Sequence, residues 1–379
     1  MRKKKYIIRT VKVLTLLLAI LLSIAFLQEY VLCHADHNRE RIKGFYLEDK
    51  DSVDVVLIGA SDVYAGFSSA YAYEKFGFTS YPFATQSNII SSYKSQIKTV
   101  IEQQHPKLIV VEINGALYSD DKQLEKEANF RNYIDNVPLN NAKVQAVKEY
   151  APENEIEYYL PIIKYHSVWN DFPAGIKWNI SIMQDNLRGY NLLKGVKNKA
   201  GVYKPDEKIY NSSLKKNTKR KPLSVKSEHY LRELLDYCRS ENITNIVFTR
   251  FPHAVTYKQI ARFKRTNTAG DIIAEYGYDF LNFEKDFDDT GLDTAVDFYN
   301  PDHMNVYGQK KFTEHLGGIL RDKYGICESE LTASQKSEWD KSVEYYEAYF
   351  KYSDSVIKNG EPRDIGENSK DMNEINKFL

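Results

Sequence analysis

The apolar run at residues 53–58 constrains the fold more than any other stretch of the sequence. Five of its six residues are apolar and three are valine. A continuous apolar run of this length indicates a strand buried on both faces of a parallel sheet. A second such run lies at 108–113, and residues 89–104 between them repeat apolar residues at helical spacing. Strand, helix and strand in this order predict a βαβ unit.

The same alternation returns near residue 229. A helix is expected at 229–242, where apolar residues share one face, followed by a third buried strand at 243–248. The pattern then predicts a helix at 268–276, a strand at 278–283 and a closing helix at 308–320. Strands that alternate with helices indicate an open α/β sheet in three layers. With 42% hydrophobic and 27% charged residues, the composition is that of a globular protein.

An aromatic-rich segment interrupts the alternation at about 116–226. It carries many tyrosines but no long apolar run of the strand type. We interpret it as an insertion that caps the carboxyl edge of the sheet, because loops at that edge build the sites of α/β proteins. A separate helical domain is the alternative. The α/β domain is expected over 52–327, and residues 328–379 are expected to form a charged surface helix and a disordered tail.

The N-terminal segment predicts a membrane anchor. Six basic residues among the first 12 precede an apolar run at 13–27. With apolar neighbours up to residue 32, this run reaches the roughly 20 residues that a membrane-spanning helix needs. Because the positive charge lies on its N-terminal side, the N-terminus is expected in the cytoplasm and the rest of the chain outside the cell. No convincing cleavage site follows, so residues 1–33 are interpreted as an anchor rather than a signal peptide, and 34–51 as a polar connector.

Charge and cysteine content exclude several classes of function. Lys plus Arg and Asp plus Glu both number 52, so no net field favours a nucleic-acid partner. Three cysteines are too few for a disulfide framework, and no Cys/His spacing predicts zinc. We therefore expect neither a metal nor a cofactor. An external protein with so few cysteines is typical of the Gram-positive cell surface.

Ser61 stands where the first strand ends and the chain turns into a helix. Gly59 permits the turn, and a serine at such a position exposes its hydroxyl, which suits a nucleophile. A polar turn in which Ser61 caps the next helix explains the same residues. A nucleophilic serine needs a base, and His303 lies in a proline-containing loop that emerges at the same edge of the sheet. His253, after the third strand, is the competing base.

Five motifs, taken in order, resemble the SGNH/GDSL hydrolase superfamily. They are DVVLIGASD at 54–62, SYPFATQSNIISSY at 80–93, HPKLIVVEI at 105–113, PIIKYHSVWNDF at 161–172 and DHMN at 302–305 with Gly308. More narrowly, the chain resembles the membrane-anchored branch that includes the lipoteichoic-acid D-alanylation protein DltD and the AlgJ- and AlgX-like alginate O-acetylation proteins. The resemblance covers about 54–316 and implies a flavodoxin-like three-layer fold with a parallel sheet.

The resemblance assigns roles to individual residues. Ser61 takes the position of the nucleophile and its own amide contributes to the oxyanion hole, while His303 takes the position of the base. Oxyanion donors are expected at Ala84 and Asn114, with Gln86 or Asn88 as substitutes. The residues expected to line the cleft are Asp62, Gln86, Tyr165 and His166.

The acid of the triad departs from the family pattern. The family places an aspartate three residues before the histidine, and this chain has Asn300 there. An amide can orient an imidazole but supplies no charge to stabilise imidazolium. Asp302, adjacent to His303, and Asp297, six residues before it, are the alternatives.

The resemblance implies an extracellular, membrane-anchored serine esterase or acyltransferase. Its substrates would be O-acetyl or D-alanyl groups of a cell-envelope polysaccharide or teichoic acid, with a membrane-bound O-acyltransferase as a partner. The alternative is an assembly or binding protein of the same pathway that has kept the fold and lost the acid. Asn300 favours this alternative, and the presence of both Ser61 and His303 opposes it.

Overall fold

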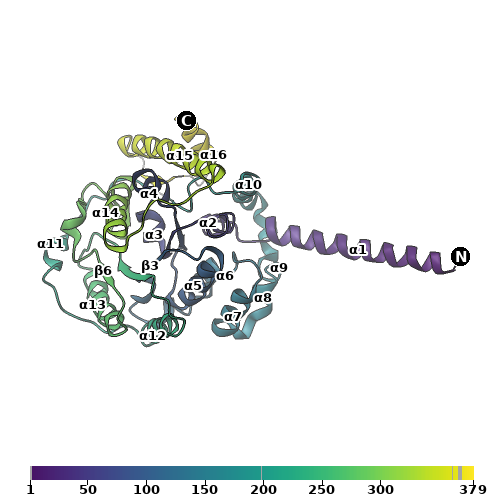
Figure 1. Cartoon of the computed structure of the whole chain (residues 1–379), viewed down its shortest axis with the longest axis horizontal. Helices are drawn as coiled ribbons and strands as arrows, with labels where there is room; N and C mark the ends of the chain where they lie inside the picture. Colours follow the sequence, from purple (N-terminus) through teal and green to yellow (C-terminus); the bar gives the residue numbers. More distant parts are fainter. Residues whose placement is uncertain (1, 198, 361, 366–368) are drawn as a thin grey trace.

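A five-stranded parallel sheet lies at the centre of the protein (Figure 1). The computed structural model describes residues 2–197, 199–360, 362–365 and 369–379. The strands of the sheet, in the order β2-β1-β3-β5-β6, are β2 (Ser80–Ala84), β1 (Val55–Gly59), β3 (Leu108–Glu112), β5 (Ile246–Arg250) and β6 (Phe280–Asn282). This order is that of a doubly wound sheet with a switch point between β1 and β3. The α/β class predicted from the apolar runs is confirmed.

Helices cover both faces of this sheet. Val56 and Ile58 of β1 point into a core shared with α5 (Ile90–Gln104), α12 (Val225–Ser240) and α13 (Ile260–Glu275). Val55 and Leu57 point into a second core on the opposite face, shared with α3 (Ser61–Gly66) and α14 (Val306–Tyr324). Successive side chains of a strand face opposite sides of its sheet, so a strand covered on both sides is apolar throughout. This is why β1, β3 and β5 were visible in the sequence as apolar runs. Strand β2, with the sequence SYPFA, is no such run and was not predicted.

The stretch expected to be a polar connector, 34–51, contains the buried helix α2 (His37–Phe45). Asp36 caps the helix by accepting the N–H groups of Asn38 and Arg39. Phe45 is fully buried in the core beside β2, and buried Arg41 donates to the carbonyl oxygens of Gly195 and Ala84. Part of the stretch expected to be a connector, residues 37–45, is therefore a helix packed into the body, with buried polar side chains that are bonded inside the protein.

The segment between β3 and α12 is largely helical. Its elements are α6 (Glu127–Ile134), α7 (Asn141–Tyr150), α8 (Glu155–Tyr159), α9 (Ile162–Tyr165), α10 (Phe172–Arg188), β4 (Lys199–Ala200) and α11 (Asn211–Leu214), with short 3-10 turns between some of them. Helices α6 to α10 lie on the side of the body where α1 enters (Figure 1). The later part crosses the carboxyl edge of the sheet, where the N–H of Lys197 bonds the carbonyl of Tyr64. The insertion thus flanks the sheet as well as crossing its edge.

The C-terminal residues also pack onto the body. They form α15 (Ala333–Lys358), β9 (Arg363–Asp364) and α16 (Ser369–Ile375), and β9 pairs with β4. Helix α15 buries Trp339, Tyr345, Tyr349 and Tyr352 on one face, and its neighbour is α4 (Ser69–Phe76). The expected surface helix is present, but the expectation of a disordered tail after it is wrong for the part of the tail that the structure describes.

Helix α1 (Arg2–Tyr30) projects away from the body (Figure 1). Within the described residues it is the one helix that is long and apolar enough to cross a membrane, and its most apolar stretch is entirely exposed. A single helix of this kind, exposed along its length, is compatible with the predicted anchor.

Candidate functional site

Ser61 is the first residue of α3 and follows β1 after a single residue, Ala60. The turn between them is tight because Gly59 packs against its neighbours. A Cβ at Gly59 would collide with Cγ2 of Val63 and would lie 2.9 Å from Cβ of Glu112. The rest of α3 is buried, whereas Ser61 stays partly exposed. The serine hydroxyl is therefore at the carboxyl edge of the sheet, where the sequence predicts it.

His303 reaches Ser61 from a two-stranded antiparallel ribbon. The ribbon consists of β7 (Phe298–Asn300) and β8 (His303–Met304), directly before α14. Nε2 of His303 lies 2.8 Å from Oγ of Ser61, and Nδ1 lies 2.9 Å from Oδ1 of Asn300. The structure thus brings together three residues that the sequence analysis singled out, although 242 positions separate Ser61 from His303.

The Asn300 amide fixes the tautomer of His303. Its Oδ1 also accepts the backbone N–H of Asp302, at 3.0 Å. A backbone N–H requires an acceptor, so the hydrogen-bond network assigns the oxygen rather than the nitrogen of the amide to this position. Nδ1 of His303 then carries the proton, and Nε2 directs its lone pair at the Ser61 hydroxyl. This is the tautomer that a general base needs.

Both aspartates near His303 are engaged elsewhere. Asp302 pairs with Arg262 of α13, and although burial opposes ionisation, Arg262 holds the pKa of Asp302 well below its usual range. Asp297 is fully buried, where it accepts the N–H of Asp293 and lies 2.7 Å from Nζ of Lys311. Of the candidate acids, Asn300 is therefore the residue that bonds the imidazole.

The surroundings of His303 keep the imidazole neutral. Burial lowers the pKa of His303 to about 4, and the ammonium group of Lys199 acts in the same direction. The carboxylates of Asp62 and Asp302 oppose this effect without overcoming it. A neutral imidazole at pH 7 can accept the proton of a serine hydroxyl.

A group of buried charged side chains lies at the same edge of the sheet. One of them is Asp62, the residue after Ser61. Arg250 at the end of β5 lies 2.9 Å from Glu112 at the end of β3 and 3.0 Å from Glu284. Arg250 also lies 3.5 Å from Asp62. All four side chains are at most 4% exposed. Sequence reasoning missed this group, although a charged residue that ends an apolar strand, as Glu112 and Arg250 do, is a signal for it.

His253, the competing base, belongs to this buried group. Its ring is fully buried, with Nε2 3.5 Å from Asp62 and Nδ1 2.7 Å from the carbonyl oxygen of Phe251. Burial and Arg250 lower the pKa of His253, but the carboxylates of Asp62 and Glu284 outweigh them and raise it. Asp62, expected to line the cleft, is likewise buried. The side chains of Asp62 and His253 therefore lie in the interior of the protein and do not line a surface cleft.

The expected oxyanion donors surround the turn at Gly59. Ala84 is aligned with Gly59 in the pairing of β2 with β1, and Asn88 donates from Nδ2 to the Gly59 carbonyl at 2.8 Å. The N–H of Asn114 donates to Glu112 at 2.8 Å, and the N–H of Gln86 donates to Asn38 at 2.7 Å. The amides of Asn114 and Gln86 are thus engaged within the protein.

Tyr165 and His166 lie at the base of α1. The Tyr165 hydroxyl donates to Asp135 at 2.5 Å, and its ring faces that of His34 at 6.3 Å between centroids. His166 is exposed and bonds the carbonyl of Ile163 at 2.8 Å. Neither has a contact with Ser61 or His303, so the structure does not bring them to the cleft where they were expected.

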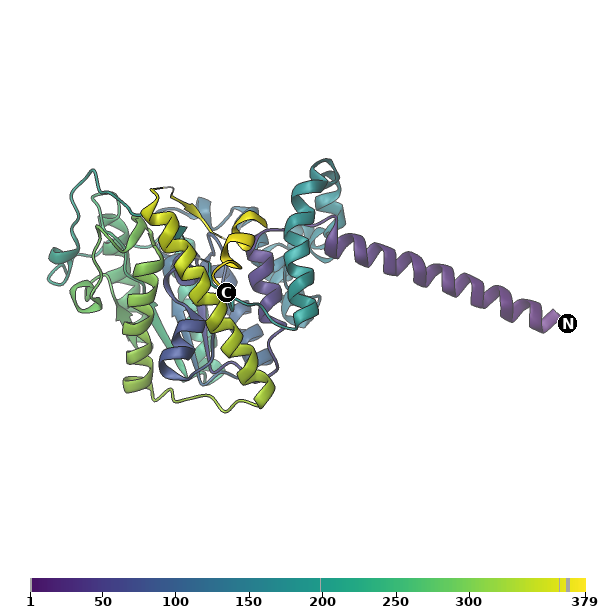
Figure 2. The same ribbon diagram turned by 90° about the horizontal axis from the view of Figure 1, so that it is seen from above.

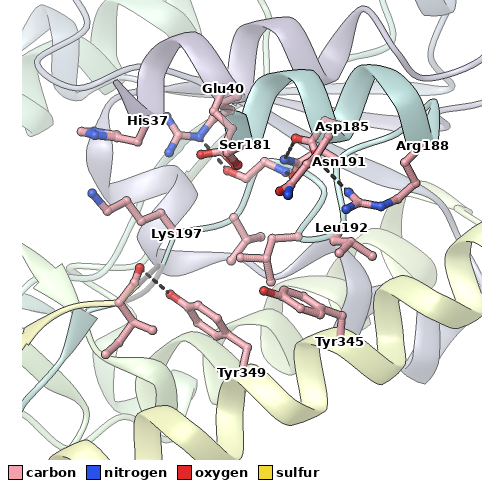
Figure 3. A pocket seen from close by; sticks show the side chains of 16 residues that line it. His37, Glu40, Ser181, Asp185, Arg188, Asn191, Leu192, Lys197, Tyr345 and Tyr349 are labelled. Atoms are coloured by element: carbon pink, nitrogen blue, oxygen red, sulfur yellow. Dashed lines mark hydrogen bonds and ion pairs between the residues drawn. The ribbon is translucent and has the colours of Figure 1, made fainter. Parts of the chain in front are cut away.

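A polar pocket lies close to α3, between α2, α10 and α15 (Figure 3). It encloses about 60 Å³. Arg41 in its wall lies 3.6 Å from the ring of Tyr64, and His37 lies 3.4 Å from the Tyr64 hydroxyl. Glu40 accepts the hydroxyl of Ser181 at 2.9 Å. Burial raises the pKa of Glu40, against the opposing effects of Ser181, Arg41 and Lys197.

No known family model matches the sequence, and no curated protein matches it. Among the described residues, no group of three or more His, Cys, Asp or Glu side chains could hold a metal ion. The chemistry of the site therefore has to be inferred from its geometry.

Proposed function

We propose that the chain is a membrane-anchored serine esterase or acyltransferase of the SGNH type. The observation that carries this proposal is the chain of two hydrogen bonds from Ser61 through His303 to Asn300. A surface serine with an ordinary role in a turn has no need of a neutral imidazole held in one tautomer. Nucleophile, base and orienting group in this order are the diagnostic arrangement of nucleophilic catalysis.

The proposed reaction begins with attack of Ser61 Oγ on the carbonyl carbon of an ester. His303 Nε2 takes the hydroxyl proton, and the tetrahedral intermediate collapses when the same proton passes to the leaving alcohol. The acyl-enzyme is then attacked by water or by a sugar hydroxyl, with His303 again accepting and returning the proton. The first acceptor gives an esterase and the second an acyltransferase.

The substrate class follows from the anchor and from the resemblance. A basic N-terminus followed by an apolar helix supports a position of the domain on the outer side of the membrane. There, acyl groups of O-acetyl or D-alanyl type on a polysaccharide or teichoic acid are the proposed substrates. A membrane-bound O-acyltransferase that supplies acyl groups from the cytoplasm is the proposed partner.

A serine-directed fluorophosphonate probe tests this function. The full chain in detergent is expected to be labelled at Ser61, and both Ser61→Ala and His303→Ala are expected to lose the label. Ser240→Ala, which removes an exposed hydroxyl at the end of α12, before β5 and at the opposite edge of the sheet, should leave labelling unchanged. Undiminished labelling of Ser61→Ala would show that Ser61 is not the nucleophile.

The second candidate is an assembly or binding protein of the same pathway. Asn300 favours it, because the group that orients His303 carries no charge. This candidate predicts that the folded wild type resists the probe, and that Ser61→Ala binds an envelope polysaccharide as tightly as the wild type does.

A further inference from the structure

Helix α10 exposes apolar side chains and buries polar ones. Ile180, Met183 and Leu187 are exposed and follow one another at helical spacing on one stripe, and Leu187 is 89% exposed. Asp185, on the opposite side, and Asn179, beside the stripe, are buried. Ile182 is also buried, and Gln184 and Asn186 are exposed. A helix on the surface of a water-soluble domain carries polar side chains on its outer face, so the three exposed apolar side chains of α10 depart from that pattern. The outer side of α10 is therefore suited to apolar surroundings.

The buried polar side chains of α10 within its described part, residues 179–188, have partners. Asp185 accepts Nδ2 of Asn191 at 2.7 Å and Nη1 of Arg188 at 2.6 Å. Ser181 bonds Glu40 in the pocket between α10 and α2, where Figure 3 shows Ser181 and Asp185 turned inward. These bonds fix the rotation of α10 about its axis. Its apolar stripe cannot turn inward without breaking them.

Helix α10 lies across the point where α1 joins the body (Figure 2). Asn179 donates to the carbonyl of Tyr30, the last residue of α1, and Nδ2 of Asn186 lies 3.4 Å from the Tyr30 hydroxyl. On another side of the junction, Arg39 and Lys43 of α2 each lie 2.9 Å from the carboxylate of Glu29. The end of α1 is thus clamped by two helices of the body. A membrane that holds α1 would meet the body at this level.

Further exposed apolar side chains surround the same junction. Leu139 lines a groove together with Ala25 and Gln28 of α1. Exposed apolar side chains on α8 and α9 and between them are Ile156, Leu160 and Ile163. Together with the stripe on α10, these side chains form what we call the junction patch, defined as Leu139, Ile156, Leu160, Ile163, Ile180, Met183 and Leu187. It contains most of the large exposed apolar side chains described outside α1.

We propose that the junction patch rests in the headgroup region of the lipid bilayer that α1 spans. An amphipathic helix at this depth lies in the plane of the membrane with its apolar side toward the acyl chains. The patch begins where the apolar helix leaves the body, which is the depth at which a bilayer surface would lie. The inference rests on α1 as a membrane anchor and is independent of the catalytic proposal.

Contact with the bilayer at two places restricts the body. A lone anchor helix leaves a domain free to tilt over the membrane, whereas an anchor plus a patch of interfacial side chains holds it in one orientation. Helix α2 begins seven residues after α1 ends, and Asn38 near its start bonds the N–H of Gln86, directly beyond the end of β2. The carboxyl edge that carries Ser61 is therefore held close to the membrane surface.

Site-directed fluorescence in lipid nanodiscs tests the membrane contact. The full chain carries Cys327→Ser, because Cys327 is the exposed cysteine while Cys33 and Cys238 are buried. An environment-sensitive dye is then attached at Leu187→Cys or Ile163→Cys. The matched control is Val225→Cys, since Val225 is 82% exposed and begins α12, outside the junction patch.

In nanodiscs of phosphatidylglycerol and phosphatidylethanolamine, the dye at Leu187 and Ile163 is expected to emit at shorter wavelength than at Val225. Lipids with a doxyl group near the headgroup are expected to quench that emission more strongly than the emission at Val225, because the dye lies at headgroup depth. Emission and quenching equal to those at Val225 would overturn the proposal and indicate a protein partner for the junction patch. A shift to shorter wavelength without quenching by lipid would also overturn it, in favour of contact between two copies of the chain.

Discussion

Replacing Asn300 by aspartate is the most direct test of how the site works. The Asn300 oxygen lies 2.9 Å from Nδ1 of His303, which puts the centre of a carboxylate about 4 Å from the ring. At an effective dielectric constant of about 20, two unit charges at about 4 Å interact by about 4 kcal/mol. Because one pKa unit corresponds to about 1.4 kcal/mol, Asn300→Asp is expected to raise the pKa of His303 from about 4 to about 7.

The assay is an NMR titration of the His303 ring, assigned by comparison with His303→Gln, and it needs no knowledge of the substrate. Asn242→Asp is the matched control, because it adds the same charge on an exposed residue just before β5, at the opposite edge of the sheet. It should leave the pKa of His303 unchanged. If Asn300→Asp folds and the pKa stays within about half a unit of the wild-type value, the proposed Asn300–His303 contact does not exist in solution.

Three further perturbations test the architecture around the site. Arg250→Met removes the guanidinium that Asp62, Glu112 and Glu284 share, so the free energy of unfolding in urea should fall by about 3–5 kcal/mol; a loss below about 1 kcal/mol would contradict the buried network. Gly308→Ala should cost about 1–3 kcal/mol, since its Cβ would collide with the backbone oxygen of Asp297, whereas Gly318→Ala, with nothing within 4 Å of the new Cβ, should not destabilise the same helix. Folding lowers the pKa of His303 below its ordinary 6.5, so the contribution of the neutral ring to the free energy of unfolding is present above pH 6.5 and is lost as the pH falls toward 4. The free energy of unfolding of the wild type relative to His303→Gln should therefore fall by about 1–3 kcal/mol over that range. A constant difference would argue against a buried neutral ring.

Strands β1, β3 and β5 were predictable because burial on both faces leaves mostly apolar side chains along each of them. Strand β2 was missed, because Ser80 and Pro82 interrupt its apolar residues. Helix α2 was not predictable, since its buried Arg41 is satisfied by carbonyl oxygens at Gly195 and Ala84. A charged residue bonded in this way cannot be told in the sequence from one that faces water. The C-terminal tail shows the same difficulty, because β9 is held by pairing with β4, about 164 positions earlier.

Some residues of the candidate site could likewise be predicted from the sequence, and others could not. The positions of Ser61 and His303 follow from a general rule, that loops after parallel strands meet at one edge of the sheet. The buried charges next to them follow from no such rule, because Glu112 and Arg250 come from different strands 138 positions apart. A charge at the end of an apolar strand indicates that a partner must exist, since an unpaired buried charge is costly. It does not say which residue the partner is.

Asparagine in place of the usual aspartate has two separable consequences for His303. In a triad whose aspartate is replaced by asparagine, much of the loss of rate comes from the wrong tautomer, because the amide nitrogen can face the ring. Here the N–H of Asp302 holds the amide oxygen of Asn300 toward the ring, so the tautomer is correct and the missing charge is the remaining cost. Asp62 and Asp302 both raise the pKa of His303 against the effect of burial, so some negative potential reaches the imidazolium without a charged neighbour on Nδ1. If the proposed function is correct, a site of this kind should therefore be slower than one with a carboxylate on Nδ1 but should retain activity.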